Sequence, residues 1–549
     1  MAPPPFRRAE MLGRLADEPF DVLVVGGGIT GAGCALDAAS RGLRTALVER
    51  DDFASGTSSK SSKLVHGGIR YLQQREFRLV YEGLRERHLA LENASHLVRL
   101  LPFLIPIFAK DGLINRRIAR AMGFAMWMYD LTGGIRIRKK HQRIDRDETM
   151  AHMPTLRRDN VASAYLYYDA RADDARLTLC LARTAAAHGA AIANYAAVNG
   201  LLKDDAGKVR GARVTADGRE IEVSARVVIN AAGVWADDVR AYDEGRDPES
   251  IRPAKGIHVA VPWGKVRNDI AAIVPVPKDR RSIFVVPWGD ITYIGTTDTD
   301  YDGPLDDPQC TPEDVDYLLG AVNRAIVEPI AHDDVLGTWA GLRPLLREAG
   351  SARTADLSRR HRVRVSDSGV ITITGGKLTT YRDMAADTVD QVARVVGTRA
   401  KCRTKKLKLL GAEGFEPPPD TPEPSLHDHL AGRFGTEAAA IHDLVQGDAE
   451  LGEALVPGLP YLRAEAIHAV RHEMAHTLDD VLSRRTRARL LARDGSAAVA
   501  EAVAELIAPE LGWDGDEIAR QVDAYRASVK HERDSAGLPE TALDASLGA

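Results

Sequence analysis

A glycine-rich turn near the N-terminus constrains the fold of this chain more than any other feature of its sequence. The turn reads Gly-Gly-Gly-Ile-Thr-Gly from Gly26, directly after an apolar run over residues 21–25. An alanine-rich helical pattern continues through Arg41, and residues 45–49 form a second strand-like run. This strand–helix–strand order predicts a Rossmann-like α/β domain in which a helix N-terminus faces the phosphates of a dinucleotide.

The residue types in the turn have separate tasks in such a site. Gly26, Gly28 and Gly31 allow a tight turn, close approach to a pyrophosphate and close packing of the helix on the strand. Glu49 ends the second strand, where a carboxylate accepts hydrogen bonds from an adenosine ribose. The fingerprint does not distinguish NAD from FAD, and a merely glycine-rich turn is the alternative. The cofactor contacts expected here are Gly26, Gly27, Gly28, Ile29, Gly31, Glu49 and Arg50.

Several longer stretches resemble one family, the FAD-dependent glycerol-3-phosphate dehydrogenases of the aerobic, respiratory type. In the family's order they are residues 57–72, 168–177, 230–235, 287–298 and 375–382, with a further match at residues 479–487 in a helical C-terminal region. The first stretch, TSSKSSKLVHGGIRYL, resembles the flavin-proximal segment of the family. Many long motifs in order are much harder to meet by chance than one short pattern.

The resemblance implies a fold as well as a cofactor. We expect a Rossmann-like FAD-binding domain of the glutathione-reductase/D-amino-acid-oxidase type, a mixed-sheet substrate domain and a C-terminal helical domain. Hydroxyls and backbone N–H groups around Ser58 suit the pyrophosphate and isoalloxazine edges of FAD, with a polar surface loop as the alternative. The further cofactor contacts implied are Thr57, Ser58, Ser61, Ser62, Leu64, His66, Gly67, Gly233, Trp235, Gly376, Lys377, Leu378 and Thr379.

The expected domains are discontinuous in sequence. Residues 1–86, 161–240 and 352–405 are assigned to the FAD-binding domain, 87–160 and 241–351 to the substrate domain, 406–424 to a proline-rich linker, and 425–549 to the helical domain. Short strands at residues 227–230, 282–287, 292–294 and 370–374 predict a second sheet. Residues 97–108 contain Pro102 and Pro106 and are predicted to be a buried connection.

The reaction implied by the resemblance is oxidation of sn-glycerol 3-phosphate to dihydroxyacetone phosphate, with hydride transfer from C2 to flavin N5. A phosphate is best held by planar bidentate donors. Arg343 and Arg359 match family positions that hold the phosphate or align the substrate, although Arg360 leaves the register around Arg359 open. An arginine is ordinarily exposed, so each has a simpler alternative. The other substrate contacts implied are Arg70, Tyr71, Lys255, Lys377 and Thr380.

The proton of the C2 hydroxyl requires a base, and a near-neutral pKa suits that step. His258 matches a family histidine close to the substrate, and His66 is the competing candidate. Either histidine has a purely structural role as its alternative. Arg343 is a further catalytic candidate, because a cation stabilises a developing alkoxide.

A second motif indicates a different chemistry. Residues 472–476 read His-Glu-Met-Ala-His, and with His468 a continuous helix would carry three histidines on one face, as in a zinc hydrolase. Such a short pattern recurs by chance in helices, and no further ligand stands at a diagnostic spacing, although Glu501 and Glu505 are candidates. We therefore expect no metal site.

Charge and cysteine content restrict partners and location. The net charge of −5 argues against bulk nucleic-acid binding, and the four cysteines form no CxxC pair, which suits a reducing cytoplasm. No window is apolar enough for a signal peptide or a spanning helix. Basic and aromatic residues alternate over residues 110–146, which predicts peripheral contact with the inner face of the cytoplasmic membrane, with a basic face over a core helix as the alternative. A quinone is the expected electron acceptor, oxygen is the alternative, and a homodimer stays open.

Overall fold

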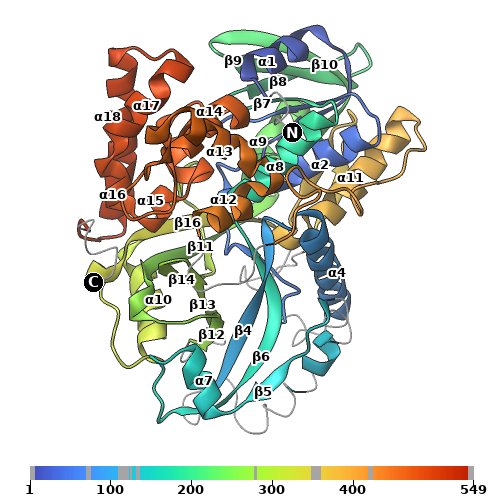
Figure 1. Cartoon of the computed structure of the whole chain (residues 1–549). Coiled ribbons are helices and arrows are strands. Elements are labelled where there is room, and N and C mark those ends of the chain that lie inside the picture. The colour runs from blue at the N-terminus through green and yellow to red at the C-terminus, as the bar shows by residue number, and fades with distance from the viewer. Residues whose placement is uncertain are drawn as a thin grey trace.

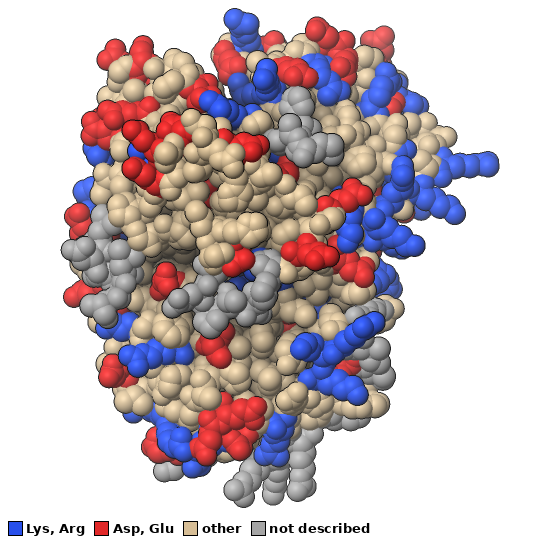
Figure 2. All heavy atoms as spheres, in the orientation of Figure 1, with Lys and Arg blue, Asp and Glu red and all other residues tan. Residues whose placement is uncertain are grey.

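The computed structural model describes residues 6–69, 76–108, 123, 126–130, 137–276, 281–347, 360–417 and 425–541. Two β-sheets form the body of the molecule, and a helical C-terminal region packs beside the upper sheet (Figure 1). On the face shown in Figure 2, acidic and basic side chains are interspersed, and basic ones gather near the end of α11 (Tyr381–Val396). No helix among the described residues is long and apolar enough to cross a membrane.

The eight-stranded sheet is built around β1 (Phe20–Val25), which pairs in parallel with β2 and β10. Side chains alternate along a strand, so Val22 and Val24 face the helices α2, α8 and α11, whereas Leu23 and Val25 face β8 and β9. Burial on both faces explains the continuous apolar run of this strand. The other elements are β2 (Thr45–Val48), β7 (Ala191–Ala193), β8 (Ala197–Lys203), β9 (Val209–Ala216), β10 (Arg219–Asn230), β17 (Arg362–Val365), β18 (Ile371–Thr374), α1 (Arg8–Asp17), α2 (Ile29–Ser40), α8 (Asp174–Ala187) and α9 (Ala236–Glu244).

The ten-stranded sheet is mixed, and one of its two long antiparallel pairings joins β11 (Ile251–Pro262) to β16 (Gly337–Leu346). Ile257, Val259 and Val261 face α10 (Pro312–Asn323), so the even-numbered residues of β11 face the opposite side. The other elements are β3 (Leu64–Val65), β4 (Val98–Phe108), β5 (Gln142–Ile144), β6 (Val161–Ala172), β12 (Ala271–Pro275), β13 (Ser282–Trp288), β14 (Ile291–Gly295), β15 (Thr299–Asp300), α4 (Phe77–Asn93) and α7 (Arg146–His152).

All elements of regular structure named after Ser425 are helical. Ser425 is the N-cap residue of the first of them and forms a capping box. Its hydroxyl accepts from the Asp428 N–H, and the Asp428 carboxylate accepts from the Ser425 N–H. The helices are α12 (Leu426–Phe434), α13 (Ala438–Gly447), α14 (Arg463–Glu473), the π-helical turn η10 (Asp480–Arg485), α15 (Ala488–Leu491), α16 (Arg493–Ala498), α17 (Ala500–Leu511) and α18 (Gly515–Ser535). The prediction of a helical C-terminal domain is confirmed.

Two predictions about strands were wrong. The strands at residues 227–230 and 370–374 extend the first sheet, because β10 pairs with β1 and β18 pairs with β10. Residues 97–108 are not a connection: they form β4, which pairs with β6 along its length. Its other edge meets β12 only at Phe103 and Leu104, so the missing N–H groups of the two prolines are tolerated.

The expected domain boundaries stay a prediction, since strand pairing alone does not delimit domains. Two strands do not follow the predicted division: β3 and β6 lie in segments assigned to the FAD-binding domain, yet both pair within the ten-stranded sheet. Residues 64–65 and 161–172 therefore belong to the ten-stranded sheet, although the segments around them were assigned to the FAD-binding domain.

Candidate active site

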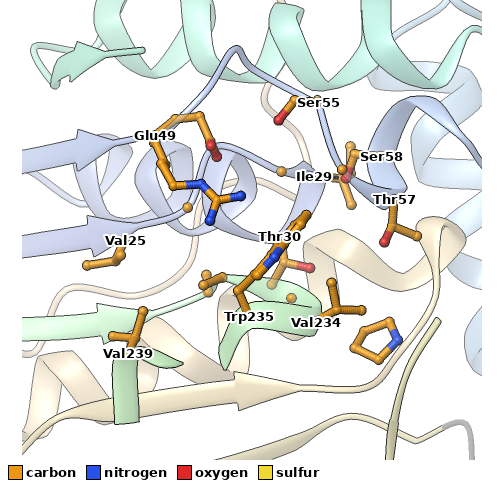
Figure 3. A pocket seen from close by; sticks show the side chains of 18 of the residues that line it. Val25, Ile29, Thr30, Glu49, Ser55, Thr57, Ser58, Val234, Trp235 and Val239 are labelled. Atoms are coloured by element: carbon orange, nitrogen blue, oxygen red, sulfur yellow. Dashed lines mark hydrogen bonds between the residues drawn. The ribbon is translucent and has the colours of Figure 1, made fainter. Parts of the chain in front are cut away.

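A pocket opens at the carboxyl ends of β1 and β2, where the glycine-rich turn leads into α2 (Figure 3). Gly26 has φ of +110°, a conformation that side chains rarely adopt. A Cβ atom at Gly31 would lie 1.9 Å from the Gly26 carbonyl oxygen. The turn can therefore close only with glycine at these positions, as the fingerprint requires.

The N-terminus of α2 faces this pocket without a side-chain cap. Gly28 is the N-cap residue, and the first turn carries no acidic residue. The Ile29 N–H donates to Ser58 Oγ at 2.9 Å, and Figure 3 shows these two residues next to each other. An uncapped helix start with its partial positive charge is a site for an anion such as a pyrophosphate.

Glu49 lies at another part of the same pocket, away from Thr57 (Figure 3). Its carboxylate accepts hydrogen bonds from the N–H groups of Gly27 at 2.5 Å and Asp51 at 2.9 Å. Burial raises the pKa of Glu49 to about 7. The Glu49 carboxyl group is thus ionised in only about half of the molecules near neutral pH.

The pocket extends from Glu49 to the segment at Lys377, and Pro344 of β16 also lines it. Trp235 forms part of the wall, where the Arg50 guanidinium lies 5.1 Å from its ring centroid. The predicted cofactor residues that line the pocket are Gly26, Gly28, Ile29, Glu49, Arg50, Thr57, Ser58, Gly233, Trp235, Gly376, Lys377 and Leu378. Those that do not line it are Gly27, Gly31, Ser61, Ser62, Leu64, His66, Gly67 and Thr379.

Several residues outside the pocket lining hold its walls in place. Thr379 Oγ1 accepts from the His66 N–H at 3.0 Å and donates to the His66 carbonyl at 3.2 Å. The Gly67 N–H donates to the buried Asp169 carboxylate at 3.2 Å, and Leu64 is buried in β3. Thr380 is buried too, and its hydroxyl donates to the Lys377 carbonyl at 3.4 Å.

A second group of predicted residues meets on one face of the ten-stranded sheet. In the register of β11 with β16, His258 lies opposite Trp339 and Ala254 lies opposite Arg343. The His258 ring stacks on Trp339 with centroids 4.7 Å apart, and its Nε2 lies 2.8 Å from Ser62 Oγ. Its Nδ1 has no hydrogen-bond partner in the described part of the chain.

The pKa of His258 differs from the near-neutral value that suits the predicted base. Burial, followed by the charges of Lys63 and Arg343, holds the pKa of His258 well below its ordinary value. The ring is therefore neutral in the ligand-free protein.

Arg343 reaches across the same face towards β14. Its guanidinium donates to Asp298 at 3.1 Å and to Thr296 Oγ1 at 3.3 Å. A Cβ atom at Gly256 would lie 2.6 Å from Arg343 Nη2, so a side chain there would displace the guanidinium from its present position. The side chain keeps 23% exposure, enough to reach a ligand.

Lys255 is not brought to this group. It occupies an odd-numbered position of β11, so its side chain points to the α10 face, where Nζ lies 2.8 Å from Asp314. The structure thus separates Lys255 from His258 and Arg343. Arg70, Tyr71 and Arg359 lie outside the described residues.

Most of the basic segment at residues 110–146 also lies outside the described residues. Of its apolar residues that are described, Met126 and Tyr129 are buried in the core, whereas Trp127 is 54% exposed. The described part of this segment thus contains both core and surface positions.

Three residues beside His258 were not singled out by sequence reasoning. Lys63 Nζ lies 4.9 Å from the Trp339 ring centroid and 3.1 Å from Asp174. Lys63 and Asp174 both fall in stretches that resemble the family, which was an available signal. Trp339 lies in no such stretch, and only the strand register reveals it.

The His-Glu-Met-Ala-His motif does not form a continuous helical face. Helix α14 ends at Glu473, and Met474 is left-handed with φ of 54°, so His476 lies beyond the helix. Glu473 forms an ion pair with Arg176 at 2.6 Å, and burial lowers the pKa of His468 to about 3. In the described ranges no group of three or more His, Cys, Asp or Glu is arranged to hold a metal ion.

A dinucleotide fingerprint at the carboxyl ends of parallel strands, beside a second, mixed sheet, indicates a dinucleotide-dependent enzyme, and the family comparison identifies the class as FAD-dependent oxidoreductases. A family model described as "FAD dependent oxidoreductase" matches residues 21–382. A second, described as "C-terminal domain of alpha-glycerophosphate oxidase", matches residues 402–518.

Individual relatives narrow this class. Glycerol-3-phosphate dehydrogenase 2 of Mycobacterium tuberculosis is 41% identical, over 98% of this chain and 92% of the relative. The mitochondrial glycerol-3-phosphate dehydrogenase of Homo sapiens is 38% identical, over 96% of this chain and 76% of the relative. The solved structure of the glycerol-3-phosphate dehydrogenase from Bacillus halodurans complexed with FAD has a TM-score of 0.76 and 33% identity, covering 95% of this chain and 97% of that one. The chain belongs to the glycerol-3-phosphate dehydrogenase family of FAD-dependent oxidoreductases.

The predicted fold class, the family and FAD as the cofactor are thus confirmed. The pocket suits FAD on its own geometry: an uncapped helix start for the pyrophosphate and a carboxylate for the ribose lie in one cavity that reaches Lys377.

Proposed function

We propose that this enzyme oxidises sn-glycerol 3-phosphate to dihydroxyacetone phosphate and passes the electrons to a quinone. The carrying observation is that Arg343 and His258 share one face of the β11–β16 pair, while Pro344, next to Arg343, lines the cofactor pocket. A phosphate-binding cation and a proton acceptor therefore lie beside the place where the cofactor ends. The names of the relatives supply the substrate.

In this proposal Arg343 binds the substrate. Its guanidinium offers planar donors that match a phosphate, and it lies against Gly256, where no side chain competes for the position. Its present partner Asp298 holds the guanidinium in place until an anion competes for it. Bound FAD supplies the hydride acceptor for C2.

His258 is the proposed base for the C2 hydroxyl. Its ring is neutral, and its Nε2 is hydrogen-bonded to the Ser62 hydroxyl. The two cations that depress its pKa would be offset by a substrate phosphate, since a nearby anion favours the imidazolium. Substrate binding would thus bring the histidine closer to the pKa that proton removal needs. His66 is the second candidate, fixed through its backbone to Thr379.

An anaerobic absorbance spectrum with and without sn-glycerol 3-phosphate tests this proposal. Bleaching of the oxidised-flavin band at about 450 nm is the expected result, because the substrate reduces the flavin directly. A flavin band that persists at saturating substrate would keep the cofactor and overturn the substrate.

The electron acceptor has one alternative that an observation favours. The family model that matches residues 402–518 is described by an alpha-glycerophosphate oxidase, whose acceptor would be oxygen. Turnover should be faster with a soluble quinone analogue under nitrogen than with oxygen alone. Oxygen consumption equal to substrate oxidation, with no gain from the quinone, would favour the oxidase.

We also propose peripheral contact with the inner face of the cytoplasmic membrane through residues 110–146. The 54% exposure of Trp127 supports it, since an aromatic ring near basic residues suits an interface with anionic lipid. Co-sedimentation with vesicles containing phosphatidylglycerol should exceed that with neutral vesicles. Equal recovery in the supernatant with both would overturn this part.

A further inference from the structure

One short segment of the C-terminal region contacts both ends of a loop that borders the cofactor pocket. We call residues 484–487 the arginine segment and residues 52–63 the cofactor loop. At the start of the cofactor loop, Asp52 accepts hydrogen bonds from Arg484 Nε at 2.7 Å and from Arg485 Nη1 at 2.6 Å. Asp52 is fully buried, so this contact is shielded from water.

The other end of the cofactor loop is held through Asp174. Arg487 pairs with Asp174 and also donates to Asp173 at 3.1 Å. Asp174 in turn accepts from the Ser61 N–H at 3.0 Å and the Ser61 hydroxyl at 2.7 Å. Its second oxygen lies 3.1 Å from Lys63 Nζ.

The charges at this end are balanced inside the protein. Lys63 and Asp174 have fully buried side chains, and that of Arg487 is 2% exposed. Two cations, Lys63 and Arg487, face two carboxylates, Asp173 and Asp174. Arg433 also lies 3.7 Å from Asp173, and its charge is offset by its own partner Glu465 at 2.9 Å. Removing one member leaves an uncompensated buried charge, so the arrangement holds only as a unit.

The residues between the two anchored ends face both the cofactor and the proposed substrate site. Ser58 accepts from Ile29 at the start of α2, and the Thr57 hydroxyl donates to Leu342 of β16 at 2.6 Å. Ser62 lies 2.8 Å from His258 Nε2. A shift of the cofactor loop would therefore move the pocket wall at Thr57 and Ser58 together with Ser62, the hydrogen-bond partner of His258.

We propose that the arginine segment positions the cofactor loop, and that Arg487 acts through Asp174 and Ser61 as a positioning residue for FAD and for the Ser62–His258 pair. The C-terminal region is then part of the machinery of cofactor binding. The inference rests on FAD as the cofactor. It does not depend on the substrate, so the test is made without substrate.

The test titrates the flavin-stripped full-length chain with FAD and records the visible circular dichroism of the bound flavin. Arg487→Lys keeps the charge but loses the fork that spans Asp173 and Asp174, and Ser61→Ala removes one hydroxyl from the same chain of contacts. Each variant should bind FAD about tenfold more weakly and change the flavin dichroism. The double variant should be no weaker than the more affected single one, since coupled residues are not additive.

Arg493→Lys is the matched control. Arg493 is fully buried like Arg487, and its guanidinium pairs with Asp494 and donates to the Pro539 carbonyl, both within the C-terminal region itself. The control should lower the melting temperature yet leave FAD affinity within about twofold, because it does not contact the cofactor loop. Equal loss of FAD affinity in the control, or strictly additive effects in the double variant, would overturn the proposal. If Arg487→Lys fails to fold, Ser61→Ala decides, and unchanged affinity and dichroism in it would also overturn the proposal.

Discussion

The cofactor pocket and the His258–Arg343 face are built in opposite ways. The pocket depends on backbone: a positive φ at Gly26, a close approach at Gly31 and the glycine N-cap of α2 come from one contiguous stretch. The other face depends on side chains from two strands that are distant in sequence and meet only through the register of β11 with β16.

This difference shows which change each site can tolerate. A backbone site fails when a Cβ atom is added, because there is no space for it, and is less sensitive to side-chain chemistry. A side-chain site fails when a functional group is lost, while its backbone is ordinary strand. Substitutions in the two regions should therefore give different kinds of defect: lost cofactor in one, lost turnover with bound cofactor in the other.

Gly31→Val should have the largest effect. Its Cβ would lie 1.9 Å from the Gly26 carbonyl oxygen, so the turn must open and the helix start must move away from the pyrophosphate. We expect FAD binding to weaken by more than about 100-fold, measured as the flavin-to-protein ratio after gel filtration. Gly320→Ala is the control, since its added Cβ would meet no atom within 4 Å outside the adjoining backbone of its own helix. A stoichiometric flavin content in Gly31→Val would contradict this account of the turn.

His258→Asn should leave FAD bound and slow its reduction. Loss of a general base costs about 10²–10⁴-fold in rate, whereas the affinity for glycerol 3-phosphate should change much less. Stopped-flow reduction at several substrate concentrations separates the two quantities. An unchanged limiting rate would move the base to His66 or elsewhere.

Arg343→Ala should lower kcat/KM by about 100-fold, the value of roughly 3 kcal/mol for charge-assisted hydrogen bonds to a phosphate. The flavin should stay bound, because Arg343 is not part of the pocket lining. Steady-state kinetics with glycerol 3-phosphate and with glycerol measures the effect. The variant should lose most of its preference for the phosphorylated substrate, and an unchanged preference would place the phosphate at another residue.

The same contrast explains what the sequence could predict. The strand–turn–helix unit is local, so the boundaries of β1, α2 and β2 were predicted to within one or two residues. The assignment of later strands to sheets failed at residues 227–230 and 370–374, because pairing between distant segments leaves no local signal.

The candidate site divides in the same manner. Cofactor residues in the fingerprint were predictable from the physical tasks of glycine and a carboxylate. Lys255 shows the limit: it was predicted to contact the substrate together with His258, but an odd spacing along a strand puts the two side chains on opposite faces. Trp339 was missed because only the register of β16 reveals it.

Glu49→Gln should change the pH dependence of FAD binding. In the flavin-free protein the carboxyl group of Glu49 has a pKa of about 7, above its ordinary value of about 4.5. Hydrogen-bond donors on the ribose favour the charged form of this group. FAD binding then releases a proton, so wild-type affinity should fall by about five- to tenfold from pH 8 to pH 6. The Gln variant should bind weakly and show little pH dependence in the same fluorescence titration. A flat wild-type profile would exclude Glu49 as the acceptor.

Glu49 also affects the stability of the flavin-free protein, and with the opposite sign. Its pKa is raised in the folded state, so the folded chain binds more protons than the unfolded chain between about pH 4.5 and 7. The contribution of Glu49 to the free energy of unfolding is therefore present below pH 4.5 and is lost as the pH rises to 7. Urea unfolding of wild type and Glu49→Gln across this range should separate it from the other groups that titrate.

Lys255→Met should have the smallest effect on catalysis, although the residue is only three positions from His258. Its Nζ pairs with Asp314 on the α10 face, so the substitution breaks a buried ion pair and should lower the melting temperature. Asp314 still accepts from the N–H and hydroxyl of Thr311 at the start of α10, which limits the damage. We expect kcat/KM to stay within about threefold of wild type, because residues of odd and even position on β11 serve different faces. A loss of kcat/KM as large as that of Arg343→Ala would mean that Lys255 reaches the substrate. The separation of the two faces of β11 would then be wrong.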